Sequence, residues 1–308
     1  MSLNAVNHRR VLHRMPELDD ELPDTTAYVR KGLEPLGAEV FSPIKGSVCA
    51  YFDAGAEETV ALRADMDALP VTECTGLFFA SERPGRMHAC GHDGHTAIEL
   101  GLAEETARMI RAGEKLPRNV LFVFQPAEET TGGAGRICET GVFEKYRVTR
   151  IFGLHLWPNL PEGSVWSRPG PMMARSNEVT LKVTGRSVHV SRAAEGLDAL
   201  RAGVDWMNAA YAWTEALPPD VLRTLQFGRM TAGTVRNAVA GSAEIQGTLR
   251  TYDEDAAEMI RSHLRTLAAE TAERTGCGLE VSFSTGYPAV WNNETLYMEP
   301  NYQIVVDR

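Results

Sequence analysis

The run NVLFVFQPAEE at residues 119–129 is apolar from Val120 to Phe124 and ends in two adjacent glutamates. Two similar runs occur elsewhere in the chain, TVALRADMD at 59–67 and IFGLHLWP at 151–158. Short runs rich in β-branched and aromatic residues are typical of buried strands in a mainly parallel sheet. Each run carries its acid or imidazole at the C-terminal end, where open α/β sheets bind their ligands. The three runs therefore predict an α/β domain with ligand-type side chains gathered at one edge of its sheet.

A fourth segment, MHACGHDGH at residues 87–95, packs three histidines, a cysteine and an aspartate around two glycines. Glycine lets the backbone turn tightly enough for neighbouring side chains to converge. Imidazole and thiolate together suit zinc, cobalt, nickel or manganese. A polar loop with unrelated histidines is the alternative interpretation, but the ligand-type residues at the three strand ends favour a metal centre.

The composition limits the class of protein. A chain of 308 residues is long enough for two domains with cores of their own. Its net charge of -10 argues against nucleic acid or an anionic membrane as a partner. We expect neither export nor membrane insertion, because the sequence has no basic apolar leader and no long uncharged apolar run. The five cysteines show no paired spacing, which suits the reducing cytoplasm, and only Cys90 stands among other potential metal ligands.

The order of the expected elements changes along the chain. Residues 1–174 alternate strand and helix patterns, with helices expected at 19–36 and 95–112, as in a sheet flanked by helices on both faces. Residues 175–287 show the order β-α-β-β-α-β, which is typical of a ferredoxin-like α+β domain. Its expected elements are strand 179–183, helix 196–217, strands 222–228 and 242–251, helix 253–274 and strand 279–283. Residues 288–308 form a short third block.

Motifs spread over most of the chain resemble those of one family. In chain order they are LHRMPEL, RADMDALPV, MHACGHDGHTA, FQPAEE followed by GGAG, GLHLWP, GTVRN and GTLRT. With these motifs the sequence resembles the M20 metallopeptidases and amidohydrolases. It is most like their N-acyl-amino-acid amidohydrolase branch, which includes aminoacylase-, hippurate hydrolase- and indoleacetyl-amino-acid hydrolase-like enzymes. The resemblance implies a zinc-peptidase-like catalytic domain with residues 175–287 inserted as a lid. It also implies a homodimer formed through the lid and two divalent ions per chain, drawn from Zn, Mn, Co and Ni.

The resemblance assigns roles around the expected metal centre. The implied metal ligands are Cys90, His92, Glu129 and His155, with the Cys90 thiolate able to bridge two ions. Glu128 is implied to be the general base that takes a proton from the attacking water. Adjacent strand residues point to opposite sides, so Glu128 can face the substrate while Glu129 faces the metal. The remaining candidates stand outside the ligand set. Asp67 is expected to be a carboxylate that orients a ligand imidazole, and Asp65 either has the same role or caps a strand end. His88 and His95 are not expected to bind the metal, and His95, at the start of a helix, is either structural or supports a ligand.

Three further site residues are expected in the lid. His189 resembles the family's lid histidine, which helps to polarise the scissile carbonyl, although Val188 stands where the family has a small residue. Asn237 and Arg250 match positions that bind the amide or carboxylate of the substrate, and an arginine fork suits a carboxylate. The alternatives are a structural histidine at His189 and a surface ion pair at Arg250.

The implied reaction is hydrolysis of a small-molecule N-acyl-amino acid to a carboxylic acid and a free amino acid. A dipeptidase or carboxypeptidase with the same metal centre is one alternative. In the family, the chain ordinarily continues beyond the lid and supplies one more metal-binding histidine. Here the sequence ends at Arg308 and its last histidine is His263. A shortened, inactive relative is therefore the other alternative.

Overall fold

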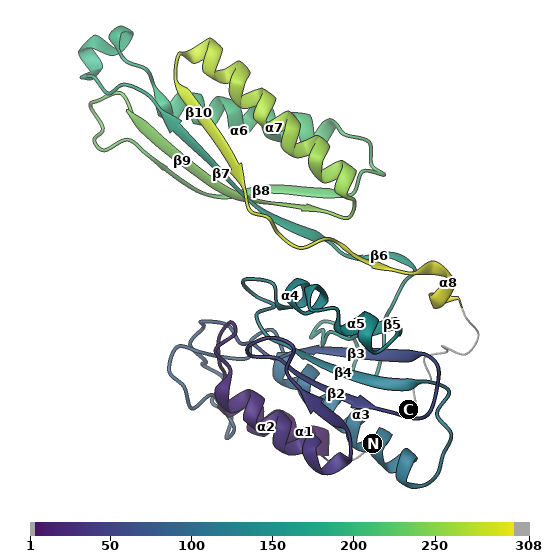
Figure 1. The fold of residues 1–308 in the computed structure, drawn as a ribbon. Coiled ribbons are helices and arrows are strands. Elements are labelled where there is room, and N and C mark those ends of the chain that lie inside the picture. Colours follow the sequence, from purple (N-terminus) through teal and green to yellow (C-terminus); the bar gives the residue numbers. More distant parts are fainter. Residues whose placement is uncertain (1–3, 299–308) are drawn as a thin grey trace. The chain divides into compact units, whose positions relative to one another are not determined.

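The computed structural model describes residues 4–298 (Figure 1). Its backbone contacts divide the chain into two compact units, one up to Leu160 and one from Pro161 onward. The domain boundaries expected at residues 174 and 287 stay predictions. The part of the third block that follows residue 298 lies outside the described residues.

The first unit is built on a five-stranded sheet in the order β1-β2-β4-β3-β5. The strands are β1 (Glu39–Phe41), β2 (Val48–Phe52), β3 (Thr59–Asp65), β4 (Asn119–Gln125) and β5 (Val148–Gly153). β3 runs parallel to both β4 and β5, whereas β1 and β2 join the sheet in antiparallel pairs. The three strands in parallel register are those that the apolar runs predict, so their C-terminal ends meet at one edge.

Helices cover both faces of this sheet (Figure 1). They are α1 (Asn4–Arg14), α2 (Pro23–Leu33), α3 (His92–Arg111), α4 (Gly133–Glu139) and α5 (Val142–Lys145), with a 3₁₀ turn, η1 (Glu34–Leu36), after α2. Successive side chains of β4 point to opposite faces. Phe122 and Phe124 pack with α2 and α3, and Leu121 and Val123 pack with α4 and α5. The predicted α/β class, a sheet flanked by helices, is confirmed.

The second unit has the β-α-β-β-α-β order that the sequence predicts. Its elements are β7 (Arg175–Thr184), η2 (Val190–Glu195), α6 (Ala199–Ala216), β8 (Arg223–Ala232), β9 (Ser242–Thr251), α7 (Glu254–Thr275) and β10 (Gly278–Phe283). The strands form an antiparallel sheet in the order β10-β7-β9-β8, and one face packs on α6 and α7 around the fully buried Trp206. A two-stranded ribbon of β6 (Gly170–Met173) and β11 (Val290–Asn292) flanks this sheet in sequence, followed by α8 (Glu294–Tyr297). Between residues 4 and 298, no helix has an apolar stretch long enough to cross a bilayer.

Arg223 ties the end of α6 to the start of β8. Its guanidinium donates hydrogen bonds of 2.8–3.2 Å to five backbone carbonyls, those of Thr214, Glu215, Leu217, Pro218 and Val221. These carbonyls lie in the last turn of a helix and the loop after it, where intrahelical donors are lacking.

We expect Arg223→Lys to lower the free energy of unfolding by about 2 kcal/mol, because one ammonium group cannot reach carbonyls that a planar fork spans. Urea unfolding followed by circular dichroism measures this loss. Arg229→Lys is the matched control, since Arg229 makes one side-chain hydrogen bond in the described structure, of 3.3 Å to Gln246. Equal losses in the two variants would contradict the role given to Arg223.

Candidate metal centre

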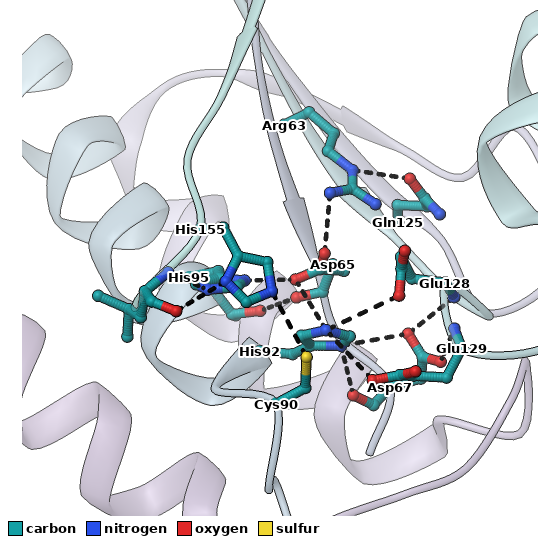
Figure 2. A network of polar contacts seen from close by, with 12 residues as sticks. Arg63, Asp65, Asp67, Cys90, His92, His95, Gln125, Glu128, Glu129 and His155 are labelled. Atoms are coloured by element: carbon teal, nitrogen blue, oxygen red, sulfur yellow. Dashed lines mark hydrogen bonds and ion pairs between the residues drawn. The ribbon is translucent and has the colours of Figure 1, made fainter. Parts of the chain in front are cut away.

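Ligand-type side chains converge at the C-terminal ends of β3, β4 and β5, as Figure 2 shows. Asp65 ends β3 and Asp67 follows it, Glu128 and Glu129 follow β4, and His155 follows β5. The start of α3 completes the cluster with Cys90 and His92. The structure therefore brings together the four metal ligands and the base that the resemblance implies.

His92 is the first residue of α3 and the centre of the cluster. Gly91 before it has a φ of 94°, a left-handed conformation that lets the chain turn sharply into the helix. The ring Nδ1 donates to the backbone carbonyl of Asp67 at 2.8 Å, which directs Nε2 into the cluster. His92 is 1% exposed, and its Nε2 has no hydrogen-bond partner among the described residues.

Cys90 and His155 form the side of the cluster next to β5. The Cys90 Sγ lies 3.4 Å from the His155 Nε2, and the His155 Nδ1 donates to the carbonyl of Leu156 at 2.7 Å. The contact with His155, with His92 close by, lowers the pKa of the Cys90 thiol. A thiolate is the form of cysteine that binds metals, so this arrangement favours ligation.

The two glutamates sit in a turn that Asp67 holds. One carboxylate oxygen of Asp67 accepts the amide of Glu128 at 2.9 Å and the other accepts that of Glu129 at 3.0 Å. The Glu129 Oε1 is buried, has no hydrogen-bond partner in the described structure, and lies 3.8 Å from the His92 Nε2. The Glu128 carboxylate lies 4.0 Å from the same nitrogen. Burial, reinforced by the charges of Asp65 and Glu129, raises the pKa of Glu128.

These side chains fit a divalent cation. Three sets have all their ligand atoms within 4.8 Å of one another, and each includes His92: Cys90 with His155, Asp65 with His95, and Glu128 with Glu129. Two atoms bound to one zinc ion lie roughly 3–4 Å apart, which matches the separation of the buried His92 nitrogen and Glu129 oxygen that lack hydrogen bonds. Burial opposes protonation of His92, but the bond to Asp67 and the negative charges of Asp65 and Asp67 outweigh it and raise the pKa of His92. The same negative charges would favour a bound cation.

Asp65 and His95 lie beside these atoms, and each already has protein partners. The Asp65 carboxylate accepts His95 Nδ1–H at 2.7 Å and pairs with Arg63 at 2.8 Å. The His95 Nε2 accepts the backbone amide of Leu156 at 2.8 Å. Asp67 contacts His92 chiefly through its backbone carbonyl, because its carboxylate is occupied by the glutamate turn.

A second buried polar group, between α1 and the start of α3, is not predicted by the sequence. Asp93 pairs with His13 at 2.7 Å and Arg9 at 2.9 Å, so α1 is fastened to the helix turn that carries His92. His88 is buried nearby, and burial lowers its pKa to about 4. His13 belongs to the LHR motif and Asp93 to the HDGH motif, but the distance between the motifs along the chain does not indicate that they meet.

The three lid candidates lie in the second unit. His189 is exposed, and its Nδ1 lies 2.8 Å from the Ser191 hydroxyl. Asn237 is on the segment beside it, because its carbonyl accepts the amide of Val190 at 3.0 Å. Arg250, on β9, is half-buried and donates to the hydroxyls of neighbouring residues on its own sheet. The roles given to these three residues stay predictions.

Ala127 has a left-handed backbone, with a φ of 55°, immediately before the glutamate turn. Its amide donates to the carbonyl of Asp19 at 3.0 Å, and Asp19 is itself left-handed, with a φ of 58°. An alanine in this region costs about 1–2 kcal/mol relative to its ordinary conformations, and a glycine does not incur this cost.

We therefore expect Ala127→Gly to leave the free energy of unfolding unchanged or to raise it by about 1 kcal/mol. Ala103→Gly, at another fully buried alanine but in the middle of α3, should lower it by at least about 1 kcal/mol. Urea unfolding of the two variants checks the difference. If Ala127→Gly lowered the free energy of unfolding as much as Ala103→Gly, Ala127 would not be strained.

Known proteins resemble this chain in both sequence and fold. The sequence profile of peptidase family M20/M25/M40 matches residues 61–299. An uncharacterized hydrolase of Staphylococcus haemolyticus is 34% identical over 293 residues, covering 95% of this chain and 76% of its own. A crystal structure of a protein from methicillin resistant Staphylococcus aureus superimposes with a TM-score of 0.89 at 31% identity, over 95% of this chain and 78% of its own. The Bacillus subtilis YXEP protein, described as a dinuclear metal binding peptidase from the M20 family, gives a TM-score of 0.77 at 32% identity, over 94% and 76% of the two chains. The chain is a hydrolase that belongs to peptidase family M20/M25/M40.

Proposed function

We propose that this hydrolase cleaves the amide bond of N-acyl-amino acids, releasing a carboxylic acid and a free amino acid. The observation that carries the proposal is the position of Glu128. Its carboxylate, whose pKa is raised, lies 4.0 Å from the buried Nε2 of His92, which has no hydrogen-bond partner among the described residues. A base beside a cation site is the arrangement that amide hydrolysis by water requires. The dinuclear metal binding peptidase among the similar structures supports two ions for this chain as well.

Cys90, His92, Glu129 and His155 would hold the metal. When bound, a divalent ion lowers the pKa of water and polarises a carbonyl oxygen. Asp67 fixes the backbone of both glutamates, so Glu128 keeps its carboxylate on the substrate side of the cluster. That carboxylate accepts the proton of the attacking water and returns it to the nitrogen that leaves. In this proposal, His189 hydrogen-bonds the carbonyl oxygen as charge builds on it, and Arg250 and Asn237 bind the carboxylate and amide of the amino acid.

A substrate panel tests the proposal. The 308-residue chain, reconstituted with zinc or manganese, is incubated with acetyl-, benzoyl- and aminoacyl-amino acids, and the release of free amino acid is measured. We expect the acetyl or benzoyl compounds to be cleaved with kcat/KM at least tenfold above that for dipeptides. If the aminoacyl-amino acids, which are dipeptides, were cleaved preferentially, the protein would be a peptidase and the proposal would be wrong. No cleavage by a chain that retains its metal would refute both activities.

We also propose a cytoplasmic homodimer joined through the second unit. β8 is an edge strand of its sheet, and the run from Gly228 to Thr231 is exposed. An edge strand with free backbone groups can pair with another copy of itself. Light scattering on the purified chain should give twice the mass of 33.8 kDa, and a monomer at micromolar concentration would refute the dimer.

A further inference from the structure

We propose that His95 is a positioning residue which, through the backbone of Leu156, fixes the orientation of the metal ligand His155. The inference rests on the proposed metal centre and adds to it a residue that acts on a ligand without binding the ion. It also explains why the second histidine of the HDGH motif lies among candidate metal ligands with both of its ring nitrogens occupied.

His95 is locked in one tautomer by its two partners. The Asp65 carboxylate can only accept, so the hydrogen at 2.7 Å belongs to the His95 Nδ1. The backbone amide of Leu156 can only donate, so the His95 Nε2 accepts it at 2.8 Å. Asp65 is in turn held by Arg63, whose Nε donates to the Gln125 side chain at 2.7 Å. The imidazole is 1% exposed and is therefore fixed from β3 and β4.

The backbone of Leu156 links His95 to His155. Its amide is held by His95, and its carbonyl accepts the Nδ1–H of His155 at 2.7 Å. With Nδ1 protonated, the Nε2 of His155 carries the lone pair that a metal needs, and it points to the Cys90 sulfur at 3.4 Å. The imidazoles of His95 and His155 pack edge to face, with ring centroids 4.6 Å apart. Figure 2 shows the two rings side by side.

The side chain of Leu156 provides a second, apolar hold on the same loop. It lies over the first turn of α3, where Gly91 and Gly94 leave room for it: a Cβ on Gly91 would stand 3.6 Å from the Leu156 Cβ. A Cβ on Gly94 would overlap the Leu156 Cδ1. The loop that carries His155 therefore contacts the first turn of α3 in two ways: through the hydrogen bond from Leu156 to His95, and through the Leu156 side chain at Gly91 and Gly94.

Binding of a metal by His95 itself is disfavoured by the same contacts. The His95 nitrogens lie close enough to Asp65 and His92 to form a ligand set. However, coordination through Nε2 would free the Leu156 amide, and coordination through Nδ1 would break the bond to Asp65. Either change would release the loop that holds His155, so the ligand set with Cys90 is the better one.

Cobalt binding to the full chain tests the inference. We expect His95→Ala to raise the cobalt dissociation constant by about 10–100-fold, the usual effect of removing a residue that orients a ligand. The visible d–d bands should shift, because His155 is lost from the coordination sphere. The near-ultraviolet thiolate-to-cobalt band should remain, because Cys90 is untouched. Thr96→Val is the matched control: it removes a 2.8 Å hydrogen bond to the same strand without touching the His155 loop, and it should leave the bands in place.

A second set of variants avoids the loss of a buried histidine. Gly94→Ala should weaken cobalt binding about tenfold, because its methyl group would displace Leu156 from the helix turn. Adding Leu156→Ala removes the overlap, and we expect the double variant to bind cobalt within about threefold of Leu156→Ala alone. A general loss of stability would not predict that this second truncation restores binding.

The outcomes separate the two proposals. If the parent chain retains no cobalt, the metal centre itself is refuted. If the parent binds cobalt but His95→Ala and Gly94→Ala match it in affinity and spectrum, the positioning role of His95 is refuted and the metal centre stands.

Discussion

Glu128→Gln should retain the full metal content of the parent chain and lose about 10²–10⁴-fold in kcat, the range that general-base catalysis contributes. The amide keeps the shape of the side chain but cannot accept a proton. Both backbone amides of the glutamate turn remain bound to Asp67, so Glu129, the proposed ligand, should stay in place. Elemental analysis and initial rates on the best substrate of the panel measure the two quantities, and KM should change little.

The matched control is Glu139→Gln, which removes the same charge at an exposed position on α4. It should leave both metal content and kcat at the parent values. If Glu128→Gln turned over at the parent rate, Glu128 would not be the base. If it lost metal as well as turnover, Glu128 would instead be a ligand.

His92→Ala should abolish metal retention, because the His92 Nε2 is common to all three sets of potential ligands in the described structure. Turnover should fall with it. A bound ion stabilises the folded state by about 2.7 kcal/mol at one hundred times its dissociation constant. The rise in the free energy of unfolding that metal produces in the parent should therefore vanish in the variant. Dialysis with elemental analysis, and urea unfolding with and without metal, test these expectations.

His263→Ala controls for the loss of an imidazole elsewhere. His263 lies on α7 and stacks on Trp213, in the second unit. This variant should bind metal like the parent. Parent-level metal in His92→Ala would show that the cluster does not need its shared nitrogen, and would remove the basis of the site.

The strands that carry the candidate site could be predicted because each apolar run ends in potential metal ligands. β1 and β2, of three and five residues, end in no such side chains and are not predicted. In the second unit, the sequence pattern placed the end of one strand at residue 228, whereas β8 runs to Ala232. The pairing of β8 with β9 shifts register between Phe227 and Arg229. A bulge of this kind breaks the alternation of side chains on which the prediction relied.

Helix ends followed caps where the sequence supplied them. α7 begins after Asp253, whose carboxylate accepts two backbone amides, close to the predicted start. The helix expected from residue 19 begins only at Pro23, because Asp19 is left-handed and starts a turn that contacts Ala127. That contact joins segments more than a hundred residues apart, and no local pattern indicates it.

The convergence of potential ligands was easier to predict than the contacts around them. A potential ligand is marked by its own chemistry, and the family motifs suggest its role. For Asp65 the sequence allows two roles, orienting an imidazole or capping a strand, and its partners in the structure are Arg63 on the same strand and His95 on α3. Which acid meets which histidine depends on the order of strands in the sheet, and that order is a property of the whole domain.

The second unit has paired strands near both of its ends. β7 and β10 pair side by side, with Val179 opposite Phe283, and the flanking strands β6 and β11 pair as well, with Gly170 opposite Asn292. Paired strands stand about 5 Å apart, so the two ends of the segment 170–292 lie side by side. Neighbouring ends are the arrangement that lets a domain tolerate circular permutation, or transfer into another chain, without disturbing its own core.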